Sequence, residues 1–263
     1  MMNVVELAAA LVVDANYITA SASSAEAFKT ATLLKTLNVN SLITGEVGVG
    51  KKSLAQYILP DAAIIDASNL DELLTTLQSV SQVIITNLEN SPNINKILNL
   101  VDSKNIRVVA TAKSSYYHEI IDKLFSIKFD IPPLQQRKED IKELIQKFTK
   151  EASHMFSINY DFNLDSFTPD LSQNANSLRR QVMISYLLQD IKESELIGII
   201  EAYLVDKLGS NNDYKDFLHI YEVPLIKAGL HRFKSQLQLS DKLGLNRNTL
   251  RKKIADNEKY MKD

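Results

Sequence analysis

Three of the seven glycines in the chain fall within GEVGVGKKS, residues 45–53. The apolar run SLIT precedes this stretch and a helical pattern follows it, which is the context that the phosphate loop G-x-x-x-x-G-K requires. In such a loop, backbone N–H groups and a helix N-terminus hold phosphate oxygens while the lysine reaches the distal phosphates. We therefore predict a nucleotide-binding site at Gly45, Glu46, Gly48, Val49, Gly50, Lys51, Lys52 and Ser53.

The position after the loop lysine normally holds a Ser or Thr hydroxyl that binds magnesium. Here that position is Lys52, and Ser53 lies one residue too late. The pattern favours ATP or ADP as a ligand and leaves the need for magnesium open. The alternative is an inherited turn that binds no nucleotide.

A second set of functional side chains lies in LGLNRNTLRKK, residues 243–253. Gly244 would make a turn between two short helices, Asn246 would cap the second helix, and Leu250 with Ile254 would pack it. This pattern predicts a helix-turn-helix, whose second helix enters the major groove of double-stranded DNA. Arg and Asn suit base edges, and Lys and Thr suit phosphates. The predicted DNA-binding residues are Asn246, Arg247, Asn248, Thr249, Arg251, Lys252 and Lys253.

The distribution of charge agrees with an anionic partner at this end of the chain. The net charge is −2, but residues 227–263 contain ten Lys or Arg and four Asp or Glu, a local balance of +6 against −8 elsewhere. A basic segment on an acidic body favours a nucleic-acid partner. The alternative is a solvated helical face with no partner.

Strands and helices must place these two sets of residues. Four short apolar runs, at residues 41–44, 63–67, 82–86 and 106–112, are typical of strands buried on both faces, with helical patterns between them. This alternation predicts a three-layer α/β domain around a parallel sheet. Ser23 and Glu26 have capping-box spacing for a helix reaching about Leu37. Strand patterns end with the segment DIPPLQQRKEDI, residues 130–141. Helical periodicity at residues 139–150 and 177–192 predicts a small all-α lid.

Helical patterns also continue to the C-terminus, at residues 194–208 and at about 214–233, 236–243 and 247–258. The segment GSNND between the first two is typical of a hinge. The predicted organisation is an α/β nucleotide-binding domain over residues 1–136, a lid over 137–193, a linker helix and hinge over 194–212, and a helix-turn-helix domain over 213–263.

Composition narrows the setting. The chain has no cysteine and four scattered histidines, which excludes disulfides and thiolate metal sites and gives no metal-ligand spacing. The apolar start NVVELAAALVV has no basic flank and contains Glu6, so it predicts a helix rather than a signal peptide. No apolar run approaches membrane-spanning length. We expect a cytoplasmic protein with no membrane partner and no metal site.

Two stretches, LITGEVGVGKKSLA and IPPLQQRKEDIKELIQKF, together resemble the AAA+ domain of NtrC-like sigma-54-dependent transcription activators. The segments YEVPLIKAGLHRF and NRNTLRKK resemble the Fis-type DNA-binding domain in which such activators often end. The resemblance covers the chain from about residue 20 to its C-terminus. It implies an AAA+ P-loop three-layer sheet domain, an α-helical lid and a Fis-type helix-turn-helix domain that works as a dimer.

The sequence departs from that family where the family performs chemistry. Hydrolysis needs an acidic pair at the end of a strand, for magnesium and for the attacking water. The GAFTGA loop that contacts sigma-54 has no counterpart in the 32 residues between Gly50 and Val83. In an alignment to the family, Thr86 and Asn87 stand where the acidic pair belongs, and Lys113 replaces the sensor asparagine. Tyr117 and Lys123 replace the two intersubunit arginines, and Asn176 replaces the lid arginine.

These features predict a sequence-specific DNA-binding transcription regulator that is not an enzyme, has no catalytic residues and does not contact sigma-54. One alternative is a divergent AAA+ ATPase that uses Glu89 as its catalytic acid, acting on DNA-bound partners. Another is an adaptor that binds neither nucleotide nor DNA productively. We expect a homodimer, for which the stripe Phe217, Ile220, Tyr221, Leu225 and Ile226 could form the surface, or else serve as intramolecular core.

Overall fold

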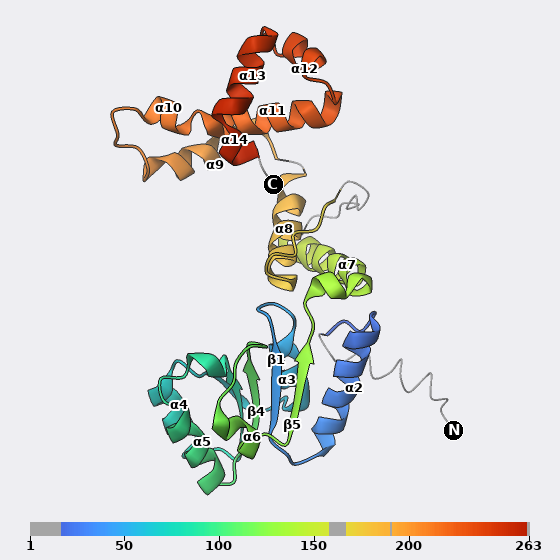
Figure 1. Cartoon of the computed structure of the whole chain (residues 1–263), viewed down its shortest axis with the longest axis vertical. Helices are drawn as coiled ribbons and strands as arrows, with labels where there is room; N and C mark the ends of the chain where they lie inside the picture. Colours follow the sequence, from blue (N-terminus) through green and yellow to red (C-terminus); the bar gives the residue numbers. More distant parts are fainter. Residues whose placement is uncertain (1–16, 158–166, 190, 262–263) are drawn as a thin grey trace, which may run out of the picture. The chain divides into compact units, whose positions relative to one another are not determined.

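The computed structural model describes residues 17–157, 167–189 and 191–261. The chain divides into two units, residues 1–190 and residues 191–263 (Figure 1). The helix predicted from the apolar N-terminal start lies outside the described residues. Among the described helices, none is both long and apolar enough to cross a membrane.

The first unit is built on a five-stranded parallel sheet with the order β2-β3-β4-β1-β5. The strands are β1 (Ser41–Gly45), β2 (Ala63–Asp66), β3 (Gln82–Thr86), β4 (Arg107–Ala112) and β5 (Ile127–Ile131). In parallel sheets all strands end at the same edge, so the residues that follow β1, β3 and β4 meet there. The predicted phosphate loop and the aligned acidic positions share this edge.

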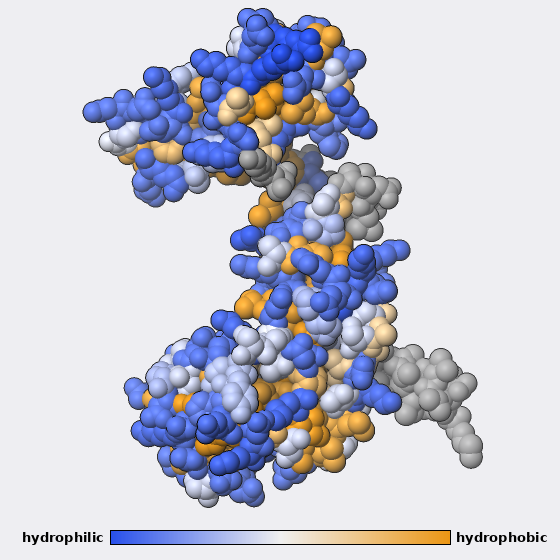
Figure 2. All heavy atoms as spheres, viewed as in Figure 1, coloured by the Kyte–Doolittle hydropathy of each residue, from blue (hydrophilic) through white to orange (hydrophobic). Residues whose placement is uncertain are grey.

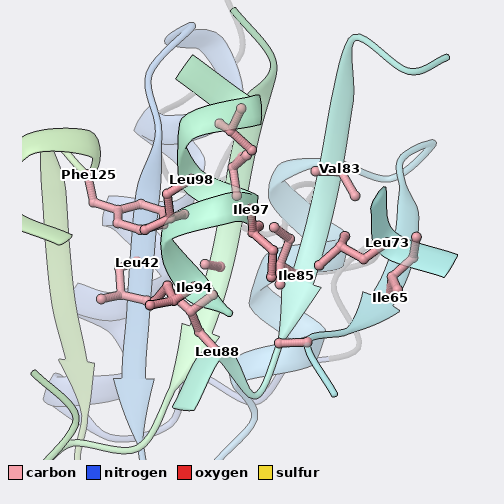
Figure 3. Close-up of a cluster of buried hydrophobic side chains, with 14 of the residues drawn as sticks. Leu42, Ile65, Leu73, Val83, Ile85, Leu88, Ile94, Ile97, Leu98 and Phe125 are labelled. Carbon is pink, nitrogen blue, oxygen red and sulfur yellow. The ribbon is translucent and has the colours of Figure 1, made fainter. Parts of the chain in front are cut away.

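Helices cover both faces of the sheet, as the apolar strands require. The helices around the sheet are α2 (Ala22–Thr36), α3 (Lys51–Ile58), α4 (Leu70–Thr76), α5 (Ile94–Ser103) and α6 (Glu119–Leu124), with a 3-10 turn η1 (Leu88–Asn90). Alternate strand residues enter opposite cores: Ile84 packs towards α2 and α3, whereas Val83 and Ile85 pack towards α4 and α5 (Figure 3). The three-layer α/β prediction is confirmed.

Two elements of the sheet domain were absent from the sequence prediction, namely α6 and the edge strand β5. In β5 the exposed Lys128 and Asp130 alternate with apolar residues, so the run lacks the continuous apolar character of the other strands. One face of β5, formed by Lys128 and Asp130, is exposed, which explains this weaker signal.

The predicted capping box of α2 was wrong. The N-cap is Ser21, whose hydroxyl accepts a hydrogen bond from the Ser24 backbone N–H at 3.2 Å, whereas Ser23 lies inside the helix. Asp140, distant in sequence, accepts hydrogen bonds from the Ser21 backbone N–H and hydroxyl and thereby fixes the start of the helix. Local spacing cannot reveal a cap that a residue 119 positions away selects.

The lid of the first unit contains η2 (Leu134–Gln136), α7 (Lys138–Phe156) and α8 (Ala175–Leu188). Its core is small and joins both helices through Ile145, Phe148, Leu178 and Val182, with Leu134 at the base. Both lid helices were predicted, and α7 extends further than the predicted 139–150.

The second unit is all-α, with α9 (Glu193–Val205), α10 (Asp213–Phe217), α11 (His219–Phe233), α12 (Gln236–Lys242), α13 (Arg247–Asp256) and α14 (Glu258–Met261). The single helix predicted over 214–233 is divided at Leu218 into α10 and α11. The core lies between α11, α12 and α13 and is formed by Ile226, Leu239 and Leu250.

Candidate nucleotide pocket and DNA-binding surface

The predicted phosphate loop connects β1 to α3, and its glycines are required by close packing. Gly48 and Gly50 have φ angles of 80° and 105°, which side-chain-bearing residues rarely adopt. A Cβ atom at Gly48 would lie 2.2 Å from the Gln173 carbonyl, and one at Gly50 would lie 2.7 Å from the ring of Tyr17. The loop is therefore clamped between the lid and the segment that precedes α2.

Lys51 begins α3 and folds back over the loop. Its ammonium donates hydrogen bonds to the carbonyls of Gly45 at 2.5 Å and Glu46 at 2.7 Å. Burial lowers the pKa of Lys51, and the carboxylates of Glu89 and Asp130 oppose that effect. A half-buried ammonium at a helix N-terminus, facing a cavity, is suited to an anionic ligand.

The loop opens into a cavity of about 650 Å³, a volume typical of small-molecule sites. Gly45 is absent from the lining of this cavity, but the other predicted nucleotide-binding residues belong to it. The lining also includes Tyr17 and Ile18, which precede α2. Further lining residues come from the carboxyl edge of the sheet and from the lid, namely Asp66, Thr86, Asn87, Glu89, Thr111, Arg137, Asp140, Leu144, Lys147, Phe148, Ala175, Asn176 and Arg179.

The strand edge holds a pair of polar groups that satisfy one another. The Asn87 amide donates to Asp66 Oδ2 at 2.6 Å, and the Ser68 hydroxyl and backbone N–H donate to Asp66 Oδ1 at 2.6 and 3.0 Å. Burial raises the pKa of Asp66, but these hydrogen bonds outweigh burial and hold it below its ordinary value. Asp66 is thus a charged acceptor whose oxygens are already engaged.

Glu89 lies in the 3-10 turn η1 and contributes to the cavity wall. Its Oε2 atom is buried without a hydrogen-bond partner. Glu89 is the catalytic acid of the ATPase alternative, and the turn brings it into the lining of the cavity with Lys51.

Asn174 attaches the lid to the phosphate loop and was not predicted as a site residue. Its amide donates to Glu46 Oε2 at 3.0 Å and to the Val47 carbonyl at 2.9 Å, while its Oδ1 accepts from the Leu134 N–H at 2.6 Å. The next residue, Ala175, donates its N–H to the Gly48 carbonyl at 3.1 Å. Asn174 directly precedes α8 with φ 53° and ψ −129°, and no pattern in the sequence indicated its contacts with the loop.

Arg137 and Asp140 form a buried ion pair beside the loop, 3.2 Å apart and with 4% and 0% of their side chains exposed. Arg137 also donates to Ser24 Oγ at 2.9 Å and to the Val49 carbonyl of the phosphate loop at 3.1 Å. Asp140 also accepts from the hydroxyls of Ser21 and Ser24. One charged pair thus joins the start of α2, the loop and the lid.

In the second unit, a tight turn joins α12 to α13. Gly244 makes the turn at φ 64°, and Asn246 caps α13 by accepting from the Thr249 N–H at 2.8 Å, as predicted. Gly229 of α11 allows close approach, since a Cβ there would lie 2.2 Å from Leu239 Cδ1. Leu250 is buried against α11 and α12, but Leu237 is exposed.

The predicted DNA-binding residues fall into two groups. Arg247, Asn248, Arg251 and Lys252 are exposed, and the surface over α12 and α13 is strongly hydrophilic in Figure 2. The other three have partners within the unit. Asn246 caps the helix, Thr249 donates its hydroxyl to Asn246 Oδ1 at 3.0 Å, and half-buried Lys253 pairs with Glu222 of α11.

The comparisons with known proteins establish the fold. No family model matches the chain. A curated relative, limonene hydroxylase from Geobacillus stearothermophilus, is 27% identical in an alignment of length 188 that covers 60% of this chain and 33% of that protein. The chain therefore spans about a third of the length of the curated relative that it matches.

Solved structures of NtrX from Brucella abortus are similar to almost the whole chain. The complex with ADP has a TM-score of 0.55 at 15% identity, and the complex with ATP has a TM-score of 0.56 at 14% identity. Each match covers 96% of this chain and 72% of the other. These matches confirm the fold class, a three-layer α/β domain around a five-stranded parallel sheet with helical additions.

Replacing Asp140 by Asn should lower the free energy of unfolding of the first unit by about 3 kcal/mol, because the charge of Arg137 would stay buried without its counter-ion. Chemical denaturation followed by circular dichroism measures this change. The control is Asp122→Asn, which breaks the exposed pair with Lys128 and should cost less than about 1 kcal/mol. Equal effects of the two substitutions would refute the structural role of the Arg137–Asp140 pair.

Proposed function

We propose that this chain is a sequence-specific DNA-binding transcription regulator whose P-loop unit binds adenine nucleotide without efficient hydrolysis. The observation that carries the proposal is the exposed basic face of α13 in a complete helix-turn-helix. Turn glycine, N-cap, buried leucines and basic residues all agree, which a chance basic helix would not produce.

Within this face, the four exposed side chains are suited to different tasks. Arg247 and Arg251 can bind guanine edges through two bonds, Asn248 can bind adenine, and Lys252 can bind phosphate. An open surface depression of about 370 Å³ lies at the start of α13. It is lined by Asn246, Arg247, Asn248, Thr249 and Lys252. The resemblance of α11 to α13 to the Fis type supports the same assignment.

Nucleotide binding is supported by Lys51, the loop glycines and the cavity, and the NtrX structures similar in fold contain ADP or ATP. The donor set does not fit a magnesium ion held by a loop hydroxyl and strand carboxylates. Lys52 occupies the hydroxyl position, Thr86 and Asn87 occupy the acidic positions, and Asp66 is engaged by Asn87 and Ser68. Nucleotide then acts as a conformational ligand rather than as fuel.

We do not propose for this chain the sigma-54 contact of the resembled family or the hydroxylation of the curated relative. Between α3 and β3 the chain forms β2 and α4, with no segment like GAFTGA, so we propose no contact with sigma-54. Hydroxylation is not proposed either, because the match covers a third of that protein and the cavity residues suit phosphate. Among the described residues, no group of three His, Cys, Asp or Glu side chains could hold a metal ion.

A homodimer is supported by α9, an apolar helix without a buried residue. Leu196, Ile199 and Tyr203 have i, i+3, i+7 spacing and are 45%, 55% and 53% exposed. A 13-residue helix is marginal unless an apolar face is packed. A second copy that presents the same stripe would bury it and would give a two-fold axis for an inverted-repeat DNA site. In the predicted stripe, Ile226 is core instead, while Tyr221 is 67% exposed.

One observation favours a second function, a divergent ATPase: the unpartnered carboxylate oxygen of Glu89 in the cavity. A carboxylate there could polarise water against a phosphate held by Lys51. The intersubunit and lid arginines of the resembled family remain absent at Tyr117, Lys123 and Asn176, and an arginine finger alone contributes about 10³–10⁵ in rate. We therefore favour binding without turnover.

The DNA assignment predicts that the double variant Arg251→Ala, Lys252→Ala abolishes specific binding. A motif is first selected from genomic fragments with the purified chain, and affinity is then measured by fluorescence anisotropy at several salt concentrations. Each lost phosphate contact should reduce the log–log salt slope by about 0.9. Lys207→Ala with Lys215→Ala removes the same charge from α9–α10 and serves as the control. Unchanged affinity in the first variant would refute DNA binding by α13 and leave the adaptor alternative.

Phosphate release from ATP by the wild-type chain should stay at background, because the acidic pair is absent. Glu89→Gln should leave this background unchanged, as should the control Glu119→Gln, which is remote from the cavity. Turnover that disappears in both Lys51→Ala and Glu89→Gln but persists in Glu119→Gln would establish the ATPase alternative instead.

Sedimentation velocity should show a dimer of the wild-type chain and a monomer of Ile199→Lys, because an ammonium would replace the centre of the buried stripe. Val205→Lys makes the same change on the opposite side of α9, where Val205 is 65% exposed, and should remain dimeric. Dissociation by both variants, or by neither, would contradict the assigned surface.

A further inference from the structure

The acids that line the cavity are already engaged with groups of the chain. Magnesium takes oxygen ligands and, beside a nucleotide, is usually held by one or two carboxylates together with the phosphates. Among the described residues of the lining, Glu46, Asp66 and Asp140 each accept hydrogen bonds from neighbouring side chains. Burial lowers the pKa of Lys51, and the remaining acid of the lining, Glu89, opposes that effect. Each of these carboxylates therefore has a hydrogen-bond donor or a cation close by.

The phosphate loop presents an ammonium where the loop pattern has the hydroxyl that binds magnesium. Lys52 is the second residue of α3, its side chain is exposed, and it belongs to the lining of the cavity. Long side chains on a helix point back towards its N-terminus, which for α3 is the phosphate loop. An ammonium has three donors and no lone pair, so it binds phosphate oxygens and repels a metal cation at the same place.

The two adjacent lysines of the loop are engaged differently. The Lys51 ammonium is drawn into the loop, where it donates to the carbonyls of Gly45 and Glu46. Within the part of the chain that the structure describes, the Lys52 side chain forms no hydrogen bond or ion pair. Neighbouring residues on a helix do not face each other, so the two ammonium groups approach the cavity from different sides of α3. Lys52 is therefore available to a ligand that Lys51 also contacts.

An exposed lysine after β4 adds positive charge at the same edge of the sheet. The ammonium of Lys113 acts in the same direction as burial and lowers the pKa of Lys51. Asp130 opposes that effect, as Glu89 does, but it already accepts hydrogen bonds from two hydroxyl groups. A divalent cation brought to this edge would be repelled by these lysines and by Lys52, whereas phosphate would be attracted to them.

We propose that this chain binds nucleotide without magnesium, and that the ammonium of Lys52 neutralises the phosphate charge that a loop-bound metal neutralises in other P-loop proteins. This inference rests on the proposed nucleotide binding. The compact charge and rotatable donors of an ammonium suit the oxygens of neighbouring phosphates. Lys52 thus replaces an exchangeable metal ion by a counter-charge that belongs to the chain, which agrees with nucleotide acting as a ligand rather than as fuel.

Isothermal titration of the full chain with ATP, in EDTA and separately in excess magnesium, tests the proposal. The wild-type chain should bind ATP about tenfold more tightly in EDTA, because magnesium competes with Lys52 for the same phosphate oxygens. Lys52→Ala should weaken binding in EDTA about tenfold and leave the affinity in magnesium nearly unchanged, so that the difference between the two media disappears.

Two variants control for the charge and for the fold. Lys52→Arg keeps the positive charge and should keep the preference for EDTA. Lys96→Ala removes an exposed lysine of α5 that lies outside the cavity lining, and it should change neither affinity. A loss of stability alone would weaken ATP binding equally in both media, so a change confined to EDTA identifies the role of Lys52 as electrostatic.

Three results would contradict the proposal in different ways. ATP binding that requires magnesium and disappears in Glu89→Gln would assign a metal ion to Glu89 and overturn the inference. Equal affinities of the wild-type chain and Lys52→Ala in EDTA would overturn it while leaving nucleotide binding intact. Binding of ATP in neither medium would also remove the nucleotide part of the proposed function.

Discussion

The first unit depends on a buried ion pair that has to be satisfied. Taking Arg137 and Asp140 out of water is costly unless their remaining hydrogen-bonding groups find partners. Partners for these groups, except for the buried Arg137 Nε, come from the start of α2 at Ser21 and Ser24 and from the phosphate loop at Val49. The electrostatic requirement therefore fixes three segments distant in sequence at one point. The cavity lies beside that point, and Arg137 and Asp140 both belong to its lining.

Sequence patterns predicted what is decided locally or by complete burial. Four strands were predicted because both of their faces are covered, and the cap at Asn246 because its hydrogen bond spans three residues. β5 was missed because an edge strand alternates apolar with charged residues. The correct cap of α2 and the lid contact at Asn174 depend on residues more than a hundred positions away. Periodicity contains no information on such contacts.

Contacts within the fold also explain why the candidate nucleotide site has the loop glycines but no acidic pair. Gly48 and Gly50 are required by Gln173 and Tyr17, whether or not nucleotide binds, so their presence reflects folding as well as chemistry. Asn87 is constrained differently, by a left-handed backbone at φ 53° and by hydrogen bonds to Thr111 and Asp66. An aspartate at 87 would place its carboxylate against Asp66, whereas the Asn87 amide donates to it. Asp66 and Asn87 are thus a matched pair, and restoring one acid without changing the other residue would create repulsion rather than a metal site.

The residues of α13 proposed to bind DNA show a comparable separation of roles. Asn246, Thr249 and Lys253 have residue types suited to DNA, yet each is engaged in holding α13 in place, Lys253 through Glu222 on α11. Their replacement would change DNA binding through the position of the helix as well as through lost contacts. Arg247, Asn248, Arg251 and Lys252 have no such structural task among the contacts described. Base discrimination requires a rigidly placed helix together with freely available side chains, so in the proposed DNA complex the first group would hold α13 in place and the second would contact the bases.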